Sequence, residues 1–172
     1  KQTINCRGKL IDFSTPQVMG IINVTPDSFF DGGKYNSESG IIERAKMHLE
    51  AGAAILDVGA MSTRPKAEMI AESDELERLI PAVKLLRTTF PEAVISVDTF
   101  RSTIAQAAIE AGADMINDIS GGTMDEAMFT TIAELQVPYV LMHIQGTPET
   151  MQDNPSYDDV TQEIITDLML KA

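Results

Sequence analysis

Five short apolar segments recur along this chain, and each is followed by a stretch with helical periodicity. The segments are rich in Ile, Val, Leu and Met and are bounded by turn residues, which is typical of strands buried on both faces of a sheet. Strands that alternate with helices across short connections predict a parallel sheet covered by helices, and thus an α/β fold. The predicted strands occupy residues 18–23, 54–59, 94–98, 114–118 and 138–143, and the predicted helices occupy residues 37–52, 73–90, 100–111, 125–136 and 156–171.

An internal repeat supports this strand and helix unit. EAGAAILDVGA at residues 50–60 aligns without gaps with EAGADMINDIS at residues 110–120. Each copy passes from a helix end through glycine into a strand, so one supersecondary unit is used again. The pattern fits a (β/α) barrel or a doubly wound sheet, and the barrel is favoured because polar residues end every predicted strand. We therefore predict one domain over residues 1–172.

Three local features refine this prediction. Residues 1–15 can form a small hairpin with its turn at Arg7 and Gly8, placed at the bottom of the barrel. Pro81 is expected to kink the second helix, because proline lacks the N–H that an interior helical position uses. Ser156 is a candidate N-cap for the last helix, since its hydroxyl can accept a hydrogen bond from a free backbone N–H.

Charge and composition exclude several classes of function. The net charge is -13 and the pI is about 4.4. Nucleic acids and anionic membranes require a clustered cationic surface, so neither is an expected partner. Cys6 is the only cysteine, which leaves neither a disulfide framework nor a cysteine zinc site. No stretch approaches the ~18 consecutive apolar residues of a membrane span, and we expect a soluble, cytoplasmic protein.

Polar residues end each of the predicted strands. They are Asn23, Asp57, Asp98, Asn117 with Asp118, and His143. The carboxyl ends of parallel strands meet at one edge of an α/β fold, so these side chains are expected to converge on one site. For Asp57 and Asp118 a structural role as a turn or cap former is an equal alternative. For His143 a structural role is nearly as plausible as contact with a ligand, and His48 is expected at the surface.

Two loops after these strands have the composition of functional segments. The first, residues 25–36, is long and rich in glycine, with two phenylalanines. The second, residues 60–66, presents hydroxyl groups beside Arg64. A guanidinium in such a loop can hold a phosphate through two hydrogen bonds. The alternative for Arg64 is a surface ion pair with the acidic stretch at residues 68–77.

Five motifs together resemble the dihydropteroate synthase family. They are NVTPDSF at 23–29 with DGG at 31–33, STRP at 62–65, SVDTF at 96–100, IND at 116–118 and LMHIQGTP at 141–148. The resemblance covers essentially the whole chain in the right order. It implies a pterin-binding TIM barrel of the (β/α)8 type. Its reaction would join 6-hydroxymethyl-7,8-dihydropterin diphosphate to 4-aminobenzoate and release diphosphate.

The resemblance also implies roles for individual residues. Asn23 corresponds to the position that binds Mg²⁺ near the diphosphate, and Asp98 and Asn117 correspond to the residues that read the pterin. Thr63 and Arg64 would contact substrate near the diphosphate, and residues 25–33 would close over the site and shape the aminobenzoate pocket. The implied catalytic residues are Asp31, Thr63, Arg64 and Asp98. The implied substrate-binding residues are Thr25, Pro26, Phe29, Thr63, Asp98, Asn117 and Met142.

The chain departs from the family pattern at the second loop and in length. Met61 stands where the family commonly has glutamate, and Lys66 stands where glycine is usual. A complete barrel takes eight β-α units and ~250 residues, whereas this sequence predicts five. The family draws an aspartate, a lysine and an arginine-histidine pair from the last three strands. We therefore expect an incomplete barrel with little or no activity on its own.

Two other functions remain open, and the family suggests an assembly state. A related pterin-binding barrel, such as the methyltetrahydrofolate domain of a corrinoid methyltransferase, would use strand-end aspartate and asparagine in a similar way. The STRP motif at 62–65 and the NVTPDSF motif at 23–29 point away from that reading. A non-catalytic pterin-binding remnant is the second alternative. The resemblance further suggests a homodimer, as in the parent family.

Overall fold

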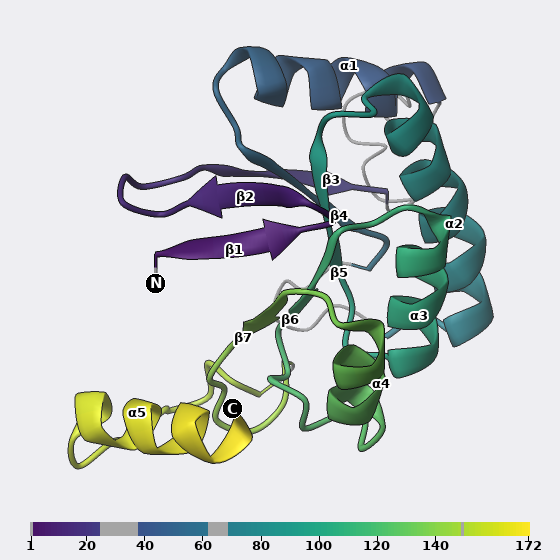
Figure 1. The fold of residues 1–172 in the computed structure, drawn as a ribbon. Coiled ribbons are helices and arrows are strands. Elements are labelled where there is room, and N and C mark those ends of the chain that lie inside the picture. Colours follow the sequence, from purple (N-terminus) through teal and green to yellow (C-terminus); the bar gives the residue numbers. More distant parts are fainter. Residues whose placement is uncertain (1, 25–37, 62–68, 149) are drawn as a thin grey trace.

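The computed structural model describes residues 2–24, 38–61, 69–148 and 150–172. Its centre is a five-stranded parallel sheet in the order β3-β4-β5-β6-β7. Helices α1 to α4 lie along one side of this sheet, and a hairpin of β1 and β2 lies on the other (Figure 1). The elements are β1 Thr3–Cys6, β2 Lys9–Asp12, β3 Met19–Asn23, α1 Glu38–Glu50, β4 Ile55–Gly59, α2 Glu72–Thr89, β5 Val94–Asp98, α3 Ser102–Ala111, β6 Met115–Asp118, α4 Met128–Leu135, β7 Tyr139–Leu141 and α5 Val160–Lys171.

The predicted alternation of strands and helices is confirmed, and the α/β class with it. Helix α2 continues through Pro81, and Pro81 is exposed to solvent. The predicted N-cap of the last helix was wrong, because α5 begins four residues after Ser156 and is capped by Asp159. Oδ1 of Asp159 accepts a hydrogen bond of 3.0 Å from the backbone N–H of Gln162, which satisfies one of the free donors of the first turn.

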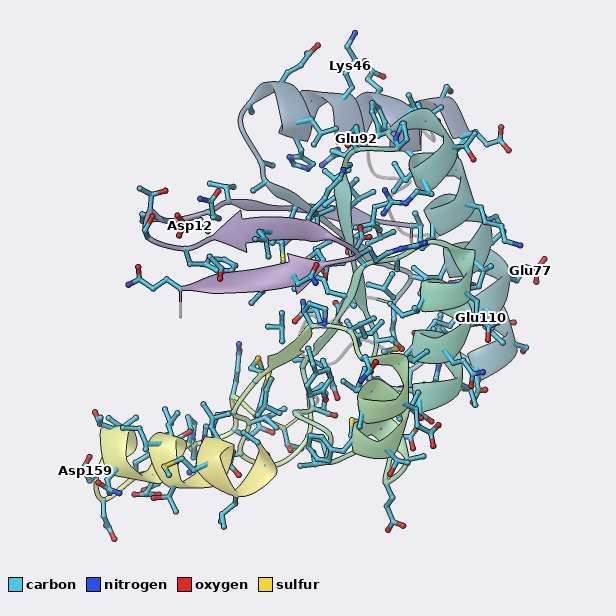
Figure 2. The ribbon with its side chains drawn as sticks, in the orientation of Figure 1. Asp12, Lys46, Glu77, Glu92, Glu110 and Asp159 are labelled. Atoms are coloured by element: carbon cyan, nitrogen blue, oxygen red, sulfur yellow. The ribbon has the colours of Figure 1, made fainter. Side chains whose placement is uncertain are left out.

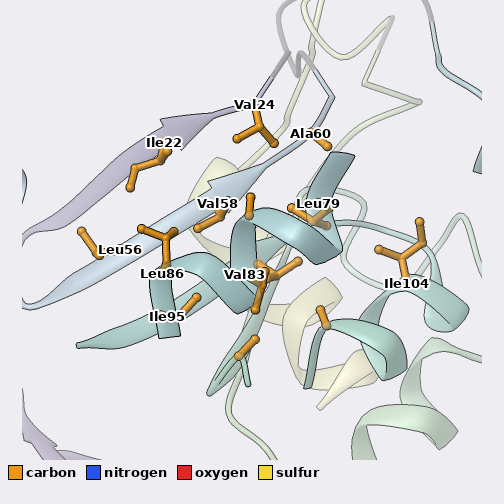
Figure 3. Packing of buried hydrophobic residues seen from close by; sticks show 14 of the residues in the cluster. Ile22, Val24, Leu56, Val58, Ala60, Leu79, Val83, Leu86, Ile95 and Ile104 are labelled. Atoms are coloured by element: carbon orange, nitrogen blue, oxygen red, sulfur yellow. The ribbon is translucent and has the colours of Figure 1, made fainter. Parts of the chain in front are cut away.

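The helix-facing side of the sheet forms the main hydrophobic core. Alternate strand residues such as Leu56, Val58 and Val97 point toward the helices and are fully buried. Leu79 and Leu86 of α2 pack against them (Figure 3). Each fully buried side chain of this size contributes about 1.5–3 kcal/mol relative to exposure. This packing holds the strand ends in fixed positions from the helix side.

The hairpin covers the opposite side at the start of the strands. Cys6 and Ile11 of the hairpin form a second cluster with the first residues of three strands, Ile55, Val94 and Met115. The turn lies at Arg7 and Gly8, with φ angles of 52° and 92°, where the sequence predicts it. Because the cluster sits at the amino ends of the strands, the hairpin occupies the bottom of the sheet and leaves the carboxyl ends uncovered.

His48 lies partly exposed at the surface, as the sequence predicts, and its ring also contacts the edge strand β3. Its Nε2 lies 3.0 Å from the carbonyl oxygen of Ile21, and its ring lies against Gly20 of β3. A Cβ on Gly20 would stand 2.7 Å from Cγ of His48, so glycine is required for this approach. The histidine therefore fastens α1 to the edge strand.

The described sheet is open. Within the described residues, β3 and β7 each pair with one neighbouring strand, so the sheet has two free edges. Helix α5 lies apart from α1 to α4 (Figure 1) and exposes 76% of Met169 and 84% of Leu170. Among the helices that the structure describes, none has the length and apolar character needed to cross a membrane.

Candidate active site

Residues from four strands form one row at the carboxyl end of the sheet. Asn23 is in register with Gly59, Gly59 with Asp98, and Asp98 with Asn117. Residues in register on neighbouring parallel strands project to the same face, and here that face is opposite the helices. The predicted convergence of Asn23, Asp98 and Asn117 is thus present in the strand pairing.

A second row lies one layer deeper on the same face. It contains Asp57 and its register partner Ser96, which are two residues before Gly59 and Asp98. Asp57 is 5% exposed and Ser96 is completely buried. The Nδ2 of Asn117 donates a hydrogen bond of 3.0 Å to Oδ2 of Asp57, which joins the two rows. We call the first row, with Asn23, Gly59, Asp98 and Asn117, the rim of the site. The second row, with Asp57 and Ser96, is its floor.

Gly59 leaves an open space between two of the rim residues. A Cβ built on this glycine would lie 3.4 Å from Oδ2 of Asp98 and 3.7 Å from Oδ1 of Asn23. The missing side chain thus keeps a gap between an amide oxygen and a carboxylate oxygen. A phosphate with its counter-ion, or a planar ring, needs such an approach to the backbone.

The pKa of Asp98 is raised to about 7. Burial is the largest cause, since a desolvated carboxylate loses the hydration that favours its charge. The negative charges of Asp57, Asp118 and Glu75 raise the pKa further, in that order. Asp98 therefore exchanges a proton near neutral pH, and a cationic ligand at the rim would favour its ionised form.

A buried charge network supports the backbone just after Asp98. Glu75 is 1% exposed and accepts a hydrogen bond of 2.8 Å from Oγ1 of Thr99. It also pairs with the guanidinium of Arg101, whose Nη2 donates to the carbonyl oxygen of Ile70 at 2.7 Å. The network ties the end of β5 to the start of α2. Sequence reasoning missed Glu75, because it lies in an acidic stretch that reads as a solvated helix face.

Asp118 points away from the site, although it is a strand-end residue. It follows Asn117 directly, so its side chain projects to the helix-facing side. Its oxygens accept hydrogen bonds from the backbone N–H groups of Ser120 at 2.7 Å and Gly122 at 2.9 Å, and from the hydroxyl of Tyr139. Burial, together with this bond, raises the pKa of Tyr139 above its ordinary range. The structural alternative for Asp118 is therefore supported.

His143 also has a structural environment. Its Nδ1 lies 2.6 Å from Oδ2 of Asp167 in α5, and its Nε2 lies 3.1 Å from the hydroxyl of Tyr157. Both ring nitrogens are therefore occupied, and they fasten α5 to the segment after β7. Met142 precedes this histidine and is half-buried. Its carbonyl oxygen would lie 2.2 Å from a Cβ on Gly121, so the segment after β7 packs closely on the loop after β6.

Six of the predicted site residues lie outside the described part of the structure. They are Thr25, Pro26, Phe29, Asp31, Thr63 and Arg64. Their predicted roles stay predictions. Met61, which ends the described segment before residues 62–68, is buried.

The described residues fit a magnesium ion only in a limited way. They contain no group of three or more His, Cys, Asp or Glu side chains that could hold a metal. Asn23 is exposed and presents its amide oxygen to the gap at Gly59, opposite an oxygen of Asp98. Mg²⁺ prefers oxygen ligands and is commonly bound by one or two protein groups together with substrate phosphates and waters. Among the described residues, Asn23 would supply one such protein oxygen.

An α/β barrel carries its helices on the outer side of a closed parallel sheet and its active site at the carboxyl ends of the strands. The described sheet has both features over five strands, as part of such a barrel would. Residues 19–172 match the family model described as pterin binding enzyme. The chain belongs to this family.

Three relatives that match this chain in sequence or in structure are dihydropteroate synthases. The chain is 45% identical to the dihydropteroate synthase of Escherichia coli over 158 residues, which cover 92% of the chain and 55% of that protein. It superimposes on Yersinia pestis dihydropteroate synthase, solved with a sulfonamide drug, with a TM-score of 0.90 at 40% identity, covering 98% of the chain and 61% of the other. Xanthomonas albilineans dihydropteroate synthase, solved with 4-aminobenzoic acid, gives a TM-score of 0.86 at 38% identity, with 99% and 59% covered.

The chain therefore spans about half to three fifths of the length of these relatives. The prediction of an α/β chain with five units of a larger barrel agrees with this coverage and with the open sheet.

Proposed function

We propose that this site is the pterin and diphosphate part of a dihydropteroate synthase. The observation that carries the proposal is the row of Asn23, Gly59, Asp98 and Asn117, in register on four neighbouring strands and on the face opposite the helices. The names of the relatives support it, because the three described above are dihydropteroate synthases. They favour this function over the methyltetrahydrofolate alternative.

The residue types suit a pterin. A pterin is planar and carries hydrogen-bond donors and acceptors around its edge, so it needs polar groups at fixed positions in an otherwise apolar pocket. Asp98 and Asn117 supply a carboxylate and an amide from adjacent strands, in register with each other. Such pairing recognises the ring because an analogue with a mismatched edge would leave buried polar groups unsatisfied.

The reaction joins two substrates at the methylene carbon of the pterin. The bond from this carbon to the diphosphate oxygen breaks, the amino nitrogen of 4-aminobenzoate forms a new bond to the carbon, and that nitrogen then loses a proton. If the carbon–oxygen bond breaks early, positive charge develops on the pterin. The ionised carboxylate of Asp98 would stabilise this charge in a buried site, where electrostatic effects are strong.

Mg²⁺ is proposed as the cofactor, with Asn23 as its protein ligand. The amide oxygen of Asn23 faces the gap left by Gly59, as an oxygen-donor site requires. When bound there with the diphosphate, the ion would neutralise negative charge on the leaving group. The net charge of -13 makes such local compensation necessary for a diphosphate.

The second substrate is proposed to be 4-aminobenzoate, which is bound in the Xanthomonas albilineans relative. Its pocket is assigned to residues 25–33, and the diphosphate contacts to Thr63 and Arg64, on the resemblance alone. A homodimer and a cytoplasmic location likewise stay predictions. Sedimentation of the purified chain tests the dimer.

Calorimetric titration with the dihydropterin diphosphate and Mg²⁺ tests the proposed function. We expect binding that depends on Mg²⁺, and at least a tenfold loss of affinity in Asp98→Ala and in Asn117→Ala. Glu77→Ala is the control, because Glu77 points outward from α2 (Figure 2). Equal affinity in all four proteins would remove this site from the proposal. A release assay for diphosphate, run beside the Escherichia coli enzyme, tests the separate prediction that this chain turns over little substrate alone.

A further inference from the structure

The amide of Asn117 has two polar ends, and its surroundings decide which end a ligand meets. The amide nitrogen is a donor and the amide oxygen is an acceptor, and rotation by half a turn exchanges them. An unrestrained asparagine could therefore pair with either kind of group. Asn117 is restrained, because its Nδ2 donates a hydrogen bond of 3.0 Å to Oδ2 of Asp57.

The carboxylate of Asp57 permits only one of the two orientations. An ionised carboxylate is an acceptor only, so the oxygen of Asn117 placed against it would meet like partial charge. The nitrogen must face Asp57, and the oxygen must face away from it. Asp57 is 5% exposed and comes from β4, which is separated from β6 by β5. The hydrogen bond therefore joins side chains from two strands that are not neighbours, across β5.

The floor of the site also holds unpaired polar atoms. Oδ1 of Asp57 and Oγ of Ser96 are buried and have no hydrogen-bond partner among the residues that the structure describes. The two residues are register partners on β4 and β5, and their side chains share the face that carries Asp98 and Asn117. A buried polar group without a partner costs about 1–3 kcal/mol. A ligand with N–H donors at this depth would remove part of that cost.

We propose that Asp57 is a positioning residue that orients the Asn117 amide so that its oxygen faces the ligand. The site then selects a heterocycle whose buried edge donates N–H groups, which is the edge formed by N3–H and the 2-amino group of a pterin. This inference rests on the proposed function, which it deepens by adding the origin of edge selectivity. Replacing the 2-amino group by a carbonyl, as in a lumazine, places an acceptor where the site expects a donor.

Asp57→Asn is the variant that tests this proposal. It preserves the shape of the side chain while allowing an amide N–H₂ to face Asn117, so the Asn117 amide can turn. The probes are 6-hydroxymethylpterin and 6-hydroxymethyllumazine, titrated into the 172-residue chain and followed by NMR. We expect the wild type to favour the pterin by at least tenfold, and Asp57→Asn to reduce that preference to about threefold or less. An unchanged preference in Asp57→Asn would overturn the inference.

A double-mutant comparison separates positioning from general damage to the fold. If Asp57 acts through Asn117, then Asp57→Asn should change the preference in the wild type and leave it unchanged in an Asn117→Ala background. An equal change in both backgrounds would overturn the inference. The side-chain ¹⁵N–¹H₂ signal of Asn117 gives a readout without ligand. It should shift in Asp57→Asn, because a hydrogen bond to a carboxylate is lost, and an unchanged signal would also contradict the proposal.

The two levels of the proposal fail in different ways. A wild-type chain that binds neither base would overturn the proposed function, and the pterin selectivity with it. A wild-type chain that prefers the pterin, with the same preference in Asp57→Asn, would leave the proposed function intact and overturn only the role of Asp57.

Discussion

Asp98 and Asp57 lie on the same face of the sheet, one layer apart, and the charge of Asp57 adds to burial in raising the pKa of Asp98 to about 7. The negative charge of Asp57 opposes ionisation of Asp98, so Asp98 keeps its proton to a higher pH. A cationic centre beside Asp98 would favour its ionised form. The protonation state of Asp98 therefore depends on the charge of the ligand that the site binds.

Asp57→Asn should lower the pKa of Asp98. The substitution removes the negative charge of Asp57, which is the second-largest cause of the upward shift, and leaves the larger contribution of burial in place. We therefore expect the pKa of Asp98 to fall while staying above its ordinary value. Titration of the ¹³C carboxyl signal of Asp98 measures this. Asp74→Asn, at an exposed position of α2, is the control and should leave the titration unchanged.

Asp98→Asn should change how stability depends on pH. The folded-state pKa of Asp98 is raised above its ordinary value of 3.8 to about 7, so its ionisation opposes folding. Its stabilising contribution is full below about pH 4 and is lost as the pH rises through 7. Relative to the wild type, Asp98→Asn should therefore be more stable at pH 8 than at pH 4, by at most a few kcal/mol. Urea unfolding of both proteins at the two pH values measures this, and a constant difference would contradict it.

Glu75→Ala should destabilise the chain strongly. The substitution removes the partner of Arg101 and Thr99 in a network whose carboxylate is 1% exposed. Breaking one side of a buried ion pair leaves the other charge uncompensated, and we expect a loss of about 3 kcal/mol in the free energy of unfolding. Chemical unfolding measures the loss. Glu77→Ala, two residues along the same helix and exposed, should stay within about 0.5 kcal/mol of the wild type.

Gly59→Ala should impair binding more than folding. The added methyl group would stand at ordinary contact distances, 3.4 Å from Asp98 and 3.7 Å from Asn23, so the fold can accept it. It would nevertheless occupy the gap that we assign to the diphosphate and Mg²⁺. We expect at least a tenfold weaker affinity for the diphosphate substrate, with less than about 1 kcal/mol of change in unfolding. Unchanged affinity would show that the gap is not used.

The alternation of strands and helices could be predicted because it is a local property of the sequence. Apolar runs and helical periodicity appear in windows of a few residues, and they located β3 to β7 and the helices α1 to α5. The start of α5 could not be placed as well, because Ser156 and Asp159 are both good cap residues. The structure uses Asp159 as the cap. Oε1 of Glu163 accepts hydrogen bonds from the N–H groups of Asp158 and Asp159, which favours a helix start at this position.

The site could be predicted only in part. Asn23, Asp98 and Asn117 end apolar runs, and the two-residue period places Asn117 and Asp118 on opposite faces. The hydrogen bond between Asp57 and Asn117 joins residues 60 positions apart on strands that are not neighbours. No short window contains that information. Glu75 was missed for a related reason, since its burial depends on Arg101, which comes from another helix boundary.

We propose that the row of Asn23, Gly59, Asp98 and Asn117 binds the pterin diphosphate. Titration of the ¹⁵N-labelled chain with 6-hydroxymethyl-7,8-dihydropterin diphosphate and Mg²⁺, followed by NMR, tests it most directly because weak binding is still visible. We expect the largest chemical-shift changes on these four residues, and we expect these changes to disappear in Asp98→Ala. Shift changes that are absent, or that fall mainly on residues outside the carboxyl ends of β3 to β6, would contradict it.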